Sequence, residues 1–301
     1  MTSKINLSFL GTSAQIPTSK RNHTAMLLQY NEENILVDCG EGTQRQFRKA
    51  RLNPNKVTRI LITHWHGDHV FGLPGILSTL SLSDYNKTLY IYGPKGTKEF
   101  IRELLKMFNF KRNYEIKVED VSGKFFETKD FYLEAKAMKH GIPTNAYCFV
   151  EKSKMRIDKA KLKKSGLPFG PLLSKIKDGK DVSYGGEKFK AKDLLYGQAG
   201  KKVCFVLDTL DNENIVGFAK DSDLLISESS FSSDDKIKAK EHLHLTAEQA
   251  GKIAKKAKVK KLILTHVSQR YEKDLKSFLK DAKKEFKNVE IAEDLKEIEL
   301  K

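Results

Sequence analysis

The stretch RILITHWHGDH, residues 59–69, decides the fold of this chain. Its first half, residues 59–63, is an apolar, β-branched run that predicts a buried strand. Its second half then falls on the loop that leaves the C-terminal end of that strand, and it carries three imidazoles and one carboxylate. Such ligands crowded on one short loop are what zinc or a similar divalent ion needs. Because the 301 residues contain only eight histidines, three on a single loop predict a metal site rather than a chance cluster.

The spacing within this loop predicts two ions rather than one. His64 and His66 are two positions apart and can face the same ion. Gly67 lacks a side chain and lets the backbone turn, so that Asp68 and His69 can face a second ion.

Four other predicted strands also run into a residue that can bind a metal. Asp38, His140, Asp208 and His266 each follow an apolar run. In α/β proteins, functional side chains collect at the C-terminal ends of strands. A single histidine at such a position is more often structural, but the five strand ends together supply enough ligands for two ions.

The alternation of strand-like and helix-like segments predicts an α/β fold over residues 1–301, taken as one domain. We expect strands at 5–10, 25–30, 34–37, 59–63, 89–92, 116–118, 131–137, 147–150, 203–207, 224–227, 262–265 and 289–292, and helices at 73–82, 98–108, 246–256 and 271–286. Thr246 is the expected N-cap of the third helix, with Gln249 three positions further on. Crossover helices on both sides predict a layered sandwich with sheets inside and helices outside.

The charge of the chain points to a polyanionic partner. The formal net charge is +16, with 55 Lys and Arg against 39 Asp and Glu. This excess is one-sided, unlike the joint rise of Lys and Glu in heat-adapted proteins, and it favours nucleic acid. Residues 151–200 carry thirteen basic against six acidic residues and seven of the 19 glycines. We expect this block to be a flexible insertion that buries little and protrudes or moves; the alternative is a solvated insertion without function.

The cysteines and the N-terminus indicate the compartment. Cys39, Cys148 and Cys204 are widely spaced, and each lies in or beside an apolar run, so we expect buried free thiols and no disulfide framework. The N-terminus lacks a secretory hydrophobic segment, and no apolar run approaches the length of a membrane span. We therefore expect a cytoplasmic protein without a membrane partner.

The pattern His-x-His-x-Asp-His after a strand, with His, Asp and His further downstream, resembles the metallo-β-lactamase superfamily. The segments VDCGEGTQRQ (37–46), KHGIP (139–143) and FGP (169–171) narrow the resemblance to tRNase Z, a family of endoribonucleases that remove the 3′ trailer from precursor tRNA. The resemblance spans almost the whole chain, from Leu10 to His266. It implies a four-layer αβ/βα sandwich with a protruding basic arm at residues 151–200, and a product tRNA that ends in a 3′-hydroxyl beside a trailer with a 5′-phosphate.

The resemblance also implies two Zn²⁺ ions, which Mn²⁺ or Fe²⁺ can replace at the same ligands, and no nucleotide cofactor. The first ion would be held by His64, His66 and His140 and the second by Asp68, His69 and His266, with Asp208 bridging the two. Asp38 would orient a ligand imidazole rather than bind metal.

Two residues are implied in proton transfer. Asp68 would act as a ligand first and as a proton acceptor for the attacking water second. His244 matches the general acid of the family, which would protonate the 3′-oxygen of the tRNA body. Glu241 or Glu228 could hold its tautomer, and His242 would serve equally well on spacing alone.

In the family, an arm grips the tRNA elbow, and its lysines would neutralise phosphates without reading sequence. The arm residues assigned to tRNA in this way are Arg156, Lys159, Lys161, Lys163, Lys164, Gly170, Pro171, Lys175 and Lys177. The loop PTSKRN (17–22) resembles the Pro-x-Lys-x-Arg-Asn loop near the 3′ end of the tRNA and adds Lys20, Arg21 and Asn22. It departs from that pattern, because Ser19 stands at the lysine position.

Three questions stay open at this point. Such enzymes are usually homodimers, and the apolar residues at 70–77 could pack at a dimer interface or belong to the core. A small-molecule phosphodiesterase of the same fold is an alternative function, although it would need neither the charge nor the arm. A non-catalytic nucleic-acid-binding protein is a third possibility, which the His and Asp ligands disfavour because structural zinc sites are closed and rich in cysteine.

Overall fold

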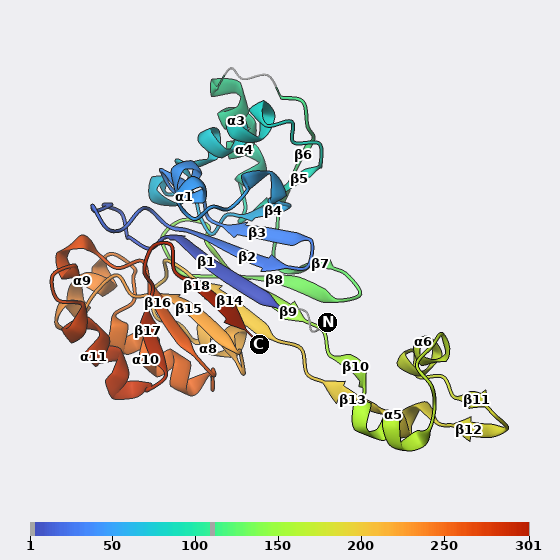
Figure 1. Ribbon diagram of the computed structural model, residues 1–301. Coiled ribbons are helices and arrows are strands. Elements are labelled where there is room, and N and C mark those ends of the chain that lie inside the picture. The colour runs from blue at the N-terminus through green and yellow to red at the C-terminus, as the bar shows by residue number, and fades with distance from the viewer. Residues whose placement is uncertain (1–3, 109–111, 301) are drawn as a thin grey trace. The chain divides into compact units, whose positions relative to one another are not determined.

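The computed structural model describes residues 4–108 and 112–300 (Figure 1). The chain divides into two compact units. The larger unit comprises Met1–Phe126, Leu133–Phe149 and Lys202–Lys301, and the smaller comprises Glu127–Tyr132 and Val150–Lys201. Among the described residues, we find no helix with the length and apolar character that a membrane crossing requires.

The first of two seven-stranded sheets has the strand order β18-β1-β2-β3-β4-β5-β6. Its strands are β1 (Ile5–Gly11), β2 (Ala25–Tyr30), β3 (Glu33–Val37), β4 (Arg59–Leu61), β5 (Leu89–Gly93), β6 (Ile116–Asp120) and β18 (Glu297–Leu300). The pairs from β18 to β3 are antiparallel, and those from β3 to β6 are parallel. The C-terminal ends of β3 and β4 therefore lie at the same edge of the sheet.

The second sheet has the order β17-β16-β15-β14-β9-β8-β7. Its strands are β7 (Gly123–Glu127), β8 (Phe131–Ala137), β9 (Asn145–Glu151), β14 (Lys202–Val206), β15 (Leu224–Glu228), β16 (Leu262–Thr265) and β17 (Val289–Ile291). The strands from β14 to β17 pair in parallel, so β14 and β16 also deliver their last residues to one edge. Side chains join the two sheets: the rings of Tyr30 and Phe149 lie 5.1 Å apart, and the Tyr147 hydroxyl donates to the Ile62 carbonyl at 2.7 Å.

Helices cover the outer face of each sheet, as Figure 1 shows. The helices α1 (Thr43–Lys49), α3 (Leu73–Leu82) and α4 (Thr97–Met107) lie beside the first sheet, and α8 (Glu213–Ala219), α10 (Ala247–Lys256) and α11 (Leu275–Glu285) beside the second. Short helices α2 (Gly67–Val70) and α9 (Lys236–Glu241) follow β4 and β15 along the chain. The expected layered sandwich, with sheets inside and helices outside, is confirmed. The expected cap is confirmed too, because Thr246 and Gln249 form a reciprocal capping box at α10.

The helical residues at 70–77 belong mainly to the core. Leu73, Ile76 and Leu77 are fully buried against α1 and the first sheet, whereas Phe71 is 66% exposed. Of the two possibilities left open for this segment, the structure therefore supports core packing for most of its apolar residues.

The smaller unit is a folded module. It contains β10 (Lys154–Ile157), α5 (Lys159–Ser165), α6 (Leu172–Lys177), β11 (Val182–Tyr184), β12 (Glu187–Phe189), α7 (Ala191–Leu194) and β13 (Leu195–Gln198). A separate apolar core holds it together, made of Leu162, Leu167, Ile176, Val182, Ala191, Leu194 and Leu195. The expectation that this block buries little is therefore wrong, because its sparse apolar residues are spaced so that they meet.

The cysteines require a second correction. Cys148 on β9 and Cys204 on β14 form a disulfide, with their Cα atoms 4.2 Å apart, and only Cys39 of the three is a free, buried thiol. The expectation of three free thiols is wrong because sequence spacing hides the pairing. The chain leaves the larger unit after β9, builds the smaller unit, and returns on the neighbouring strand 56 residues later.

Candidate metal centre

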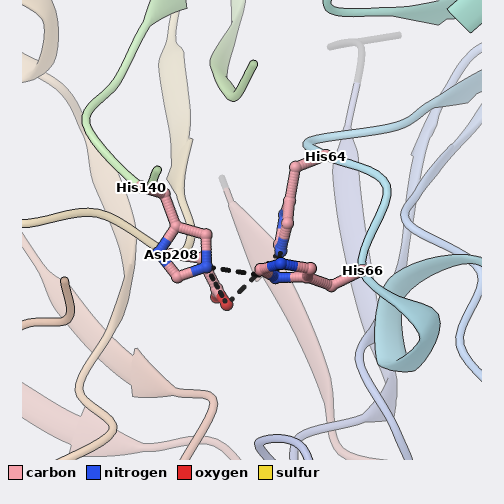
Figure 2. Close-up of side chains that lie close together, drawn as sticks. All are labelled: His64, His66, His140 and Asp208. Carbon is pink, nitrogen blue, oxygen red and sulfur yellow. Dashed lines mark hydrogen bonds and ion pairs between the residues drawn. The ribbon is translucent and has the colours of Figure 1, made fainter. Parts of the chain in front are cut away.

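The loops after β3, β4, β8, β14 and β16 bring the predicted ligands together within the larger unit. Two groups of side chains offer donor atoms within 4.8 Å of one another. The first group is His64, His66, His140 and Asp208, and the second is Asp68, His69 and His266. Figure 2 shows the first group, with the imidazoles of the β4 loop facing His140 and Asp208 across a narrow gap.

In the first group, the ring nitrogens converge on one point. His66 Nδ1 lies 3.0 Å from His64 Nε2 and 3.2 Å from His140 Nε2. Asp208 Oδ2 lies 3.6 Å from His64 Nε2 and 3.5 Å from His140 Nε2.

The second group shares Asp208 with the first. His69 Nε2 and His266 Nε2 are 3.2 Å apart, and Asp68 Oδ2 lies 3.4 Å from the former and 3.3 Å from the latter. Asp208 reaches these same two nitrogens, with Oδ2 at 3.5 Å from His69 and Oδ1 at 3.3 Å from His266. One carboxylate therefore contacts both groups.

The donor set fits divalent metal ions. Neutral imidazole nitrogens that face one another cannot all be satisfied by hydrogen bonds among themselves, because each ring has one donor only. Zn–N bonds of about 2.0–2.1 Å at tetrahedral angles put two ligand nitrogens roughly 3.3 Å apart, close to the spacings seen here. Asp208 Oδ1 is buried without a hydrogen-bond partner, so it has a lone pair to offer. The cluster is therefore a metal-binding site.

The charges of the cluster also favour a cation. Burial would raise the pKa of Asp68, but His69 and His266 outweigh it and lower that pKa. Burial likewise would raise the pKa of Asp208, but His266 and His69 lower it well below its usual range. For His64, burial and the neighbouring His69 lower the pKa, so this ring stays neutral and keeps a lone pair for a metal.

Residues outside the two groups orient the ligands. Asp38 Oδ2 lies 2.7 Å from His69 Nδ1, and both the amide and the hydroxyl of Thr63 donate to the Asp38 carboxylate at 2.7 Å. Ser230 Oγ lies 2.8 Å from His266 Nδ1, and the Leu243 carbonyl lies 3.1 Å from His140 Nδ1. Each contact leaves the opposite ring nitrogen to face the cluster. We did not expect Thr63, Ser230 or Leu243, since their sequence contexts carry no sign of this role.

Three of the clustered carboxylates and imidazoles occupy the left-handed backbone region. Asp38, Asp208 and His266 have φ angles of 55°, 35° and 57°. Such angles cost energy for residues with a Cβ atom and are typical of functional sites. The turns that follow β3, β14 and β16 therefore aim these side chains inward at the expense of backbone strain.

His244 is held by a buried carboxylate. Its Nδ1 lies 3.0 Å and 3.1 Å from the two carboxylate oxygens of Glu228, which also accept from Thr209 N at 2.5 Å and Ser230 Oγ at 2.7 Å. Burial would lower the pKa of His244, but Glu228 and Asp208 raise it to about 9. Between the two glutamates left open by the sequence, the structure places Glu228 on His244, whereas Glu241 is exposed on α9.

His242 occupies a different environment from His244. It is exposed, and its ring lies parallel to that of Phe231 with centroids 6.0 Å apart. Both histidines line a cavity of about 500 Å³ that also reaches His66, Asp68 and Asp208. The cavity can thus hold a substrate group against the cluster and against both histidines.

The loop at residues 17–22 divides into buried and exposed parts. Arg21 is 5% exposed, and its guanidinium donates to Thr12 Oγ1 at 2.6 Å and to the Ala292 carbonyl at 2.7 Å. The Asn22 amide donates to the Glu41 carbonyl at 2.5 Å, and Lys20 is exposed. Arg21 therefore stabilises the loop, and Lys20 is the side chain in it that is free to meet a phosphate.

Most of the basic residues assigned to tRNA in the smaller unit face solvent. Exposed residues there are Lys159, Lys161, Lys163, Lys164, Gly170, Pro171, Lys175 and Lys177. Arg156 is half-buried, and its Nε donates to Gln198 Oε1 at 2.8 Å.

Comparison with known proteins identifies close relatives over nearly the whole chain. Ribonuclease Z of Nanoarchaeum equitans is 40% identical over 292 residues, which cover 97% of this chain and 92% of that protein. Ribonuclease Z of Listeria monocytogenes serovar 1/2a is 40% identical over 299 residues, which cover 97% and 98% of the two chains. The family model described as Anti-Pycsar protein Apyc1 matches residues 5–139.

Solved structures give a consistent result. The short form of human tRNase Z superposes with a TM-score of 0.71 at 29% identity, covering 97% of this chain and 98% of that one. The metallo-β-lactamase fold protein YhfI of Bacillus subtilis has a TM-score of 0.73 at 19% identity, over 99% and 100% of the two chains, and shares the fold. The expected metallo-β-lactamase sandwich is thereby confirmed.

Proposed function

This chain belongs to the ribonuclease Z family, and we infer from that premise that it is a metal-dependent endoribonuclease that removes the 3′ trailer from precursor tRNA. The observation that supports this most directly is the convergence of seven His and Asp side chains from five loops in a chain that is 40% identical to ribonuclease Z. The products are a tRNA with a 3′-hydroxyl and a trailer with a 5′-phosphate.

We propose that the cluster holds two Zn²⁺ ions, with Mn²⁺ or Fe²⁺ as possible substitutes. The residues that would hold them are His64, His66 and His140 for one ion and Asp68, His69 and His266 for the other, with Asp208 between them. Bound there, the ions would withdraw charge from a phosphate oxygen and acidify water. Asp38 supports this role of its neighbour by fixing the His69 ring through Nδ1.

Asp68 and His244 would handle the protons of the reaction. The lowered pKa of Asp68 favours its ligand role, because a strongly acidic carboxyl group holds a proton only weakly, and proton acceptance from the attacking water comes second. The pKa of His244, near 9, keeps its imidazole protonated at neutral pH. That is the state needed to donate a proton to the departing 3′-oxygen of the tRNA body.

Glu228 and Ser230 would position the general acid. The contact of Glu228 with His244 Nδ1 leaves Nε2 as the ring nitrogen that donates to the leaving oxygen. Ser230 contacts the Glu228 carboxylate, at 2.7 Å, and the His266 ring, at 2.8 Å. One hydroxyl thereby couples the orientation of the acid to that of a ligand.

Substrate selection would depend on the smaller unit. We propose that residues 151–200 act as an arm that grips precursor tRNA far from the cut, through phosphate contacts of its exposed lysines. Lys20 would contact the 3′ end of the tRNA. We further propose a homodimer, in which the arm of one subunit serves the site of the other.

The alternative of a small-molecule phosphodiesterase is not favoured. It would need neither the +16 net charge nor a folded lysine-rich insertion, and the near-full-length relatives are named ribonuclease Z.

The test is to incubate the purified, metal-loaded protein with a precursor tRNA and to determine the chemistry of both new ends. We expect a 3′-hydroxyl on the tRNA body and a 5′-phosphate on the trailer. His244→Ala should slow this cleavage by roughly 10²- to 10⁴-fold, the range for loss of a general acid. Products that end in a cyclic phosphate, or an intact precursor after long incubation, would reject the proposal.

A further inference from the structure

An aromatic pair with a cation above it forms part of the cavity wall beside the metal cluster. The rings of Phe231 and His242 lie parallel, with an interplanar angle of 5° and centroids 6.0 Å apart. The Arg270 guanidinium lies 5.2 Å from the centroid of Phe231. All three side chains line the cavity of about 500 Å³ that contains the ligands. The proposed reaction leaves this group without a role.

The burial of the three residues differs in an informative way. Phe231 is 6% exposed, whereas His242 and Arg270 are exposed. Phe231 is further fixed by backbone hydrogen bonds on both sides, since its amide donates to the Leu245 carbonyl at 3.3 Å and its carbonyl accepts from Ala247 N at 2.9 Å. Phe231 is thus a rigid support, and His242 is the ring that a substrate can reach.

A flat, exposed ring beside a nuclease cavity is suited to a nucleobase. Every base has an aromatic face, and stacking on a protein ring contributes about 1–3 kcal/mol per base without reading its identity. An enzyme that acts on many tRNAs meets different bases next to the cut, so a stacking contact can hold them all. A hydrogen-bonding contact would distinguish among them.

The position of His244 indicates which base this is. Its ring centroid lies 6.0 Å from that of Phe231, the same distance as His242 on the other side. In the proposed function, on which this inference rests, His244 protonates the 3′-oxygen that leaves with the tRNA body. The base of the nucleotide that owns this oxygen is one ribose away from it. We propose that His242, supported by Phe231, is a substrate-positioning residue that stacks on the last base of the mature tRNA body.

The experiment compares the wild type with His242→Ala, His242→Phe and His242→Gln on a precursor tRNA under single-turnover conditions. We expect His242→Ala to lower kcat/KM by roughly 5- to 150-fold, which corresponds to the stacking energy of one base. His242→Phe should retain most of the activity, because it keeps a flat ring and loses only the ring nitrogens. His242→Gln should resemble His242→Ala, because it keeps a polar side chain and loses the ring.

A second set of substrates locates the base. One precursor lacks the base of the last nucleotide before the cut, and another lacks the base of the first trailer nucleotide. On the first substrate, we expect the wild type to lose activity and His242→Ala to show little further loss, so that the two cleave at similar rates. On the second, the full difference between wild type and variant should persist. Ile237→Ala, at an exposed position of α9, is the matched control for a surface change, and thermal melts verify folding of all variants.

The outcomes separate the two levels of inference. If the wild type fails to cleave the intact precursor, the proposed function fails. If it cleaves but His242→Phe is as slow as His242→Ala, the ring does not act by stacking and the inference is overturned. It is equally overturned if the wild type and His242→Ala converge on the substrate that lacks the trailer base instead.

Discussion

The disulfide between Cys148 and Cys204 should account for a large share of the stability of the larger unit. It closes a loop between residues 56 positions apart, and a cross-link of that length removes enough entropy from the unfolded chain to stabilise the native state by about 4 kcal/mol. Both sulfurs are fully buried, so a reductant acts on the unfolded chain rather than on the native protein.

The assay is equilibrium unfolding in urea, followed by the near-ultraviolet signal of the larger unit, with and without an excess of a phosphine reductant. We expect the reduced wild type to unfold with a free energy lower by about 4 kcal/mol. Cys39→Ala is the matched control, because it removes a buried thiol that is not cross-linked and should keep the full response to reductant. In the Cys148→Ala/Cys204→Ala double variant, the response should vanish. A wild-type midpoint that reductant leaves unchanged would refute the reasoning.

Four further predictions follow from the metal centre and the smaller unit. Glu228→Gln should move the alkaline fall of kcat to lower pH, because the charge of Glu228 raises the pKa of His244 to about 9 and its removal lets the imidazolium deprotonate earlier; Glu241→Gln should leave that limb in place, and an unmoved limb in Glu228→Gln would contradict the assignment. Zn²⁺ at 1,000 times its Kd should raise the free energy of unfolding of the metal-free protein by about 4 kcal/mol, measured in urea, with a smaller gain in Asp208→Asn; equal gains would argue against the shared carboxylate. Asp38→Asn should weaken Zn²⁺ binding by roughly 10- to 100-fold in competition with a chromogenic chelator, because it weakens the contact that orients His69, and undiminished affinity would exclude that role. Replacing Lys161, Lys163 and Lys164 by alanine should weaken precursor tRNA binding and flatten its salt dependence by roughly 0.7–0.9 in log–log slope per lost phosphate contact, while the melting curve stays the same; an unchanged slope would place these lysines away from the RNA.

Local patterns in the sequence predict a large part of this structure. The β-branched run at 59–63 and the apolar runs that precede Asp208 and His266 indicate strands, because their neighbours in sequence are their neighbours in space. Parallel strands then carry their final residues to one edge, so the ligand set can be inferred before any coordinates are known. Thr246 with Gln249 marks a helix start for the same local reason.

The failures concern contacts between residues far apart in sequence. Nothing near Cys148 indicates Cys204, because the partner is chosen by sheet order after a long insertion. The choice between Glu228 and Glu241 is equally non-local, since β15 delivers Glu228 to His244 while the closer Glu241 turns outward. Burial of Arg21 depends on the carbonyl of Ala292 near the other end of the chain. The strand β18 was not expected because its alternating Glu and apolar residues are typical of a sheet edge, where half-exposed side chains give a weak pattern.

The chain departs from and rejoins the larger unit through two adjacent strands that Cys148 and Cys204 fasten together. Whatever is spliced between them inherits anchored ends, and the scaffold below the splice point keeps its registration however long the insert becomes. This makes positions 149 and 202 a natural docking port for transplants: a foreign recognition module grafted there would redirect the hydrolase to another polyanion while leaving the chemistry intact.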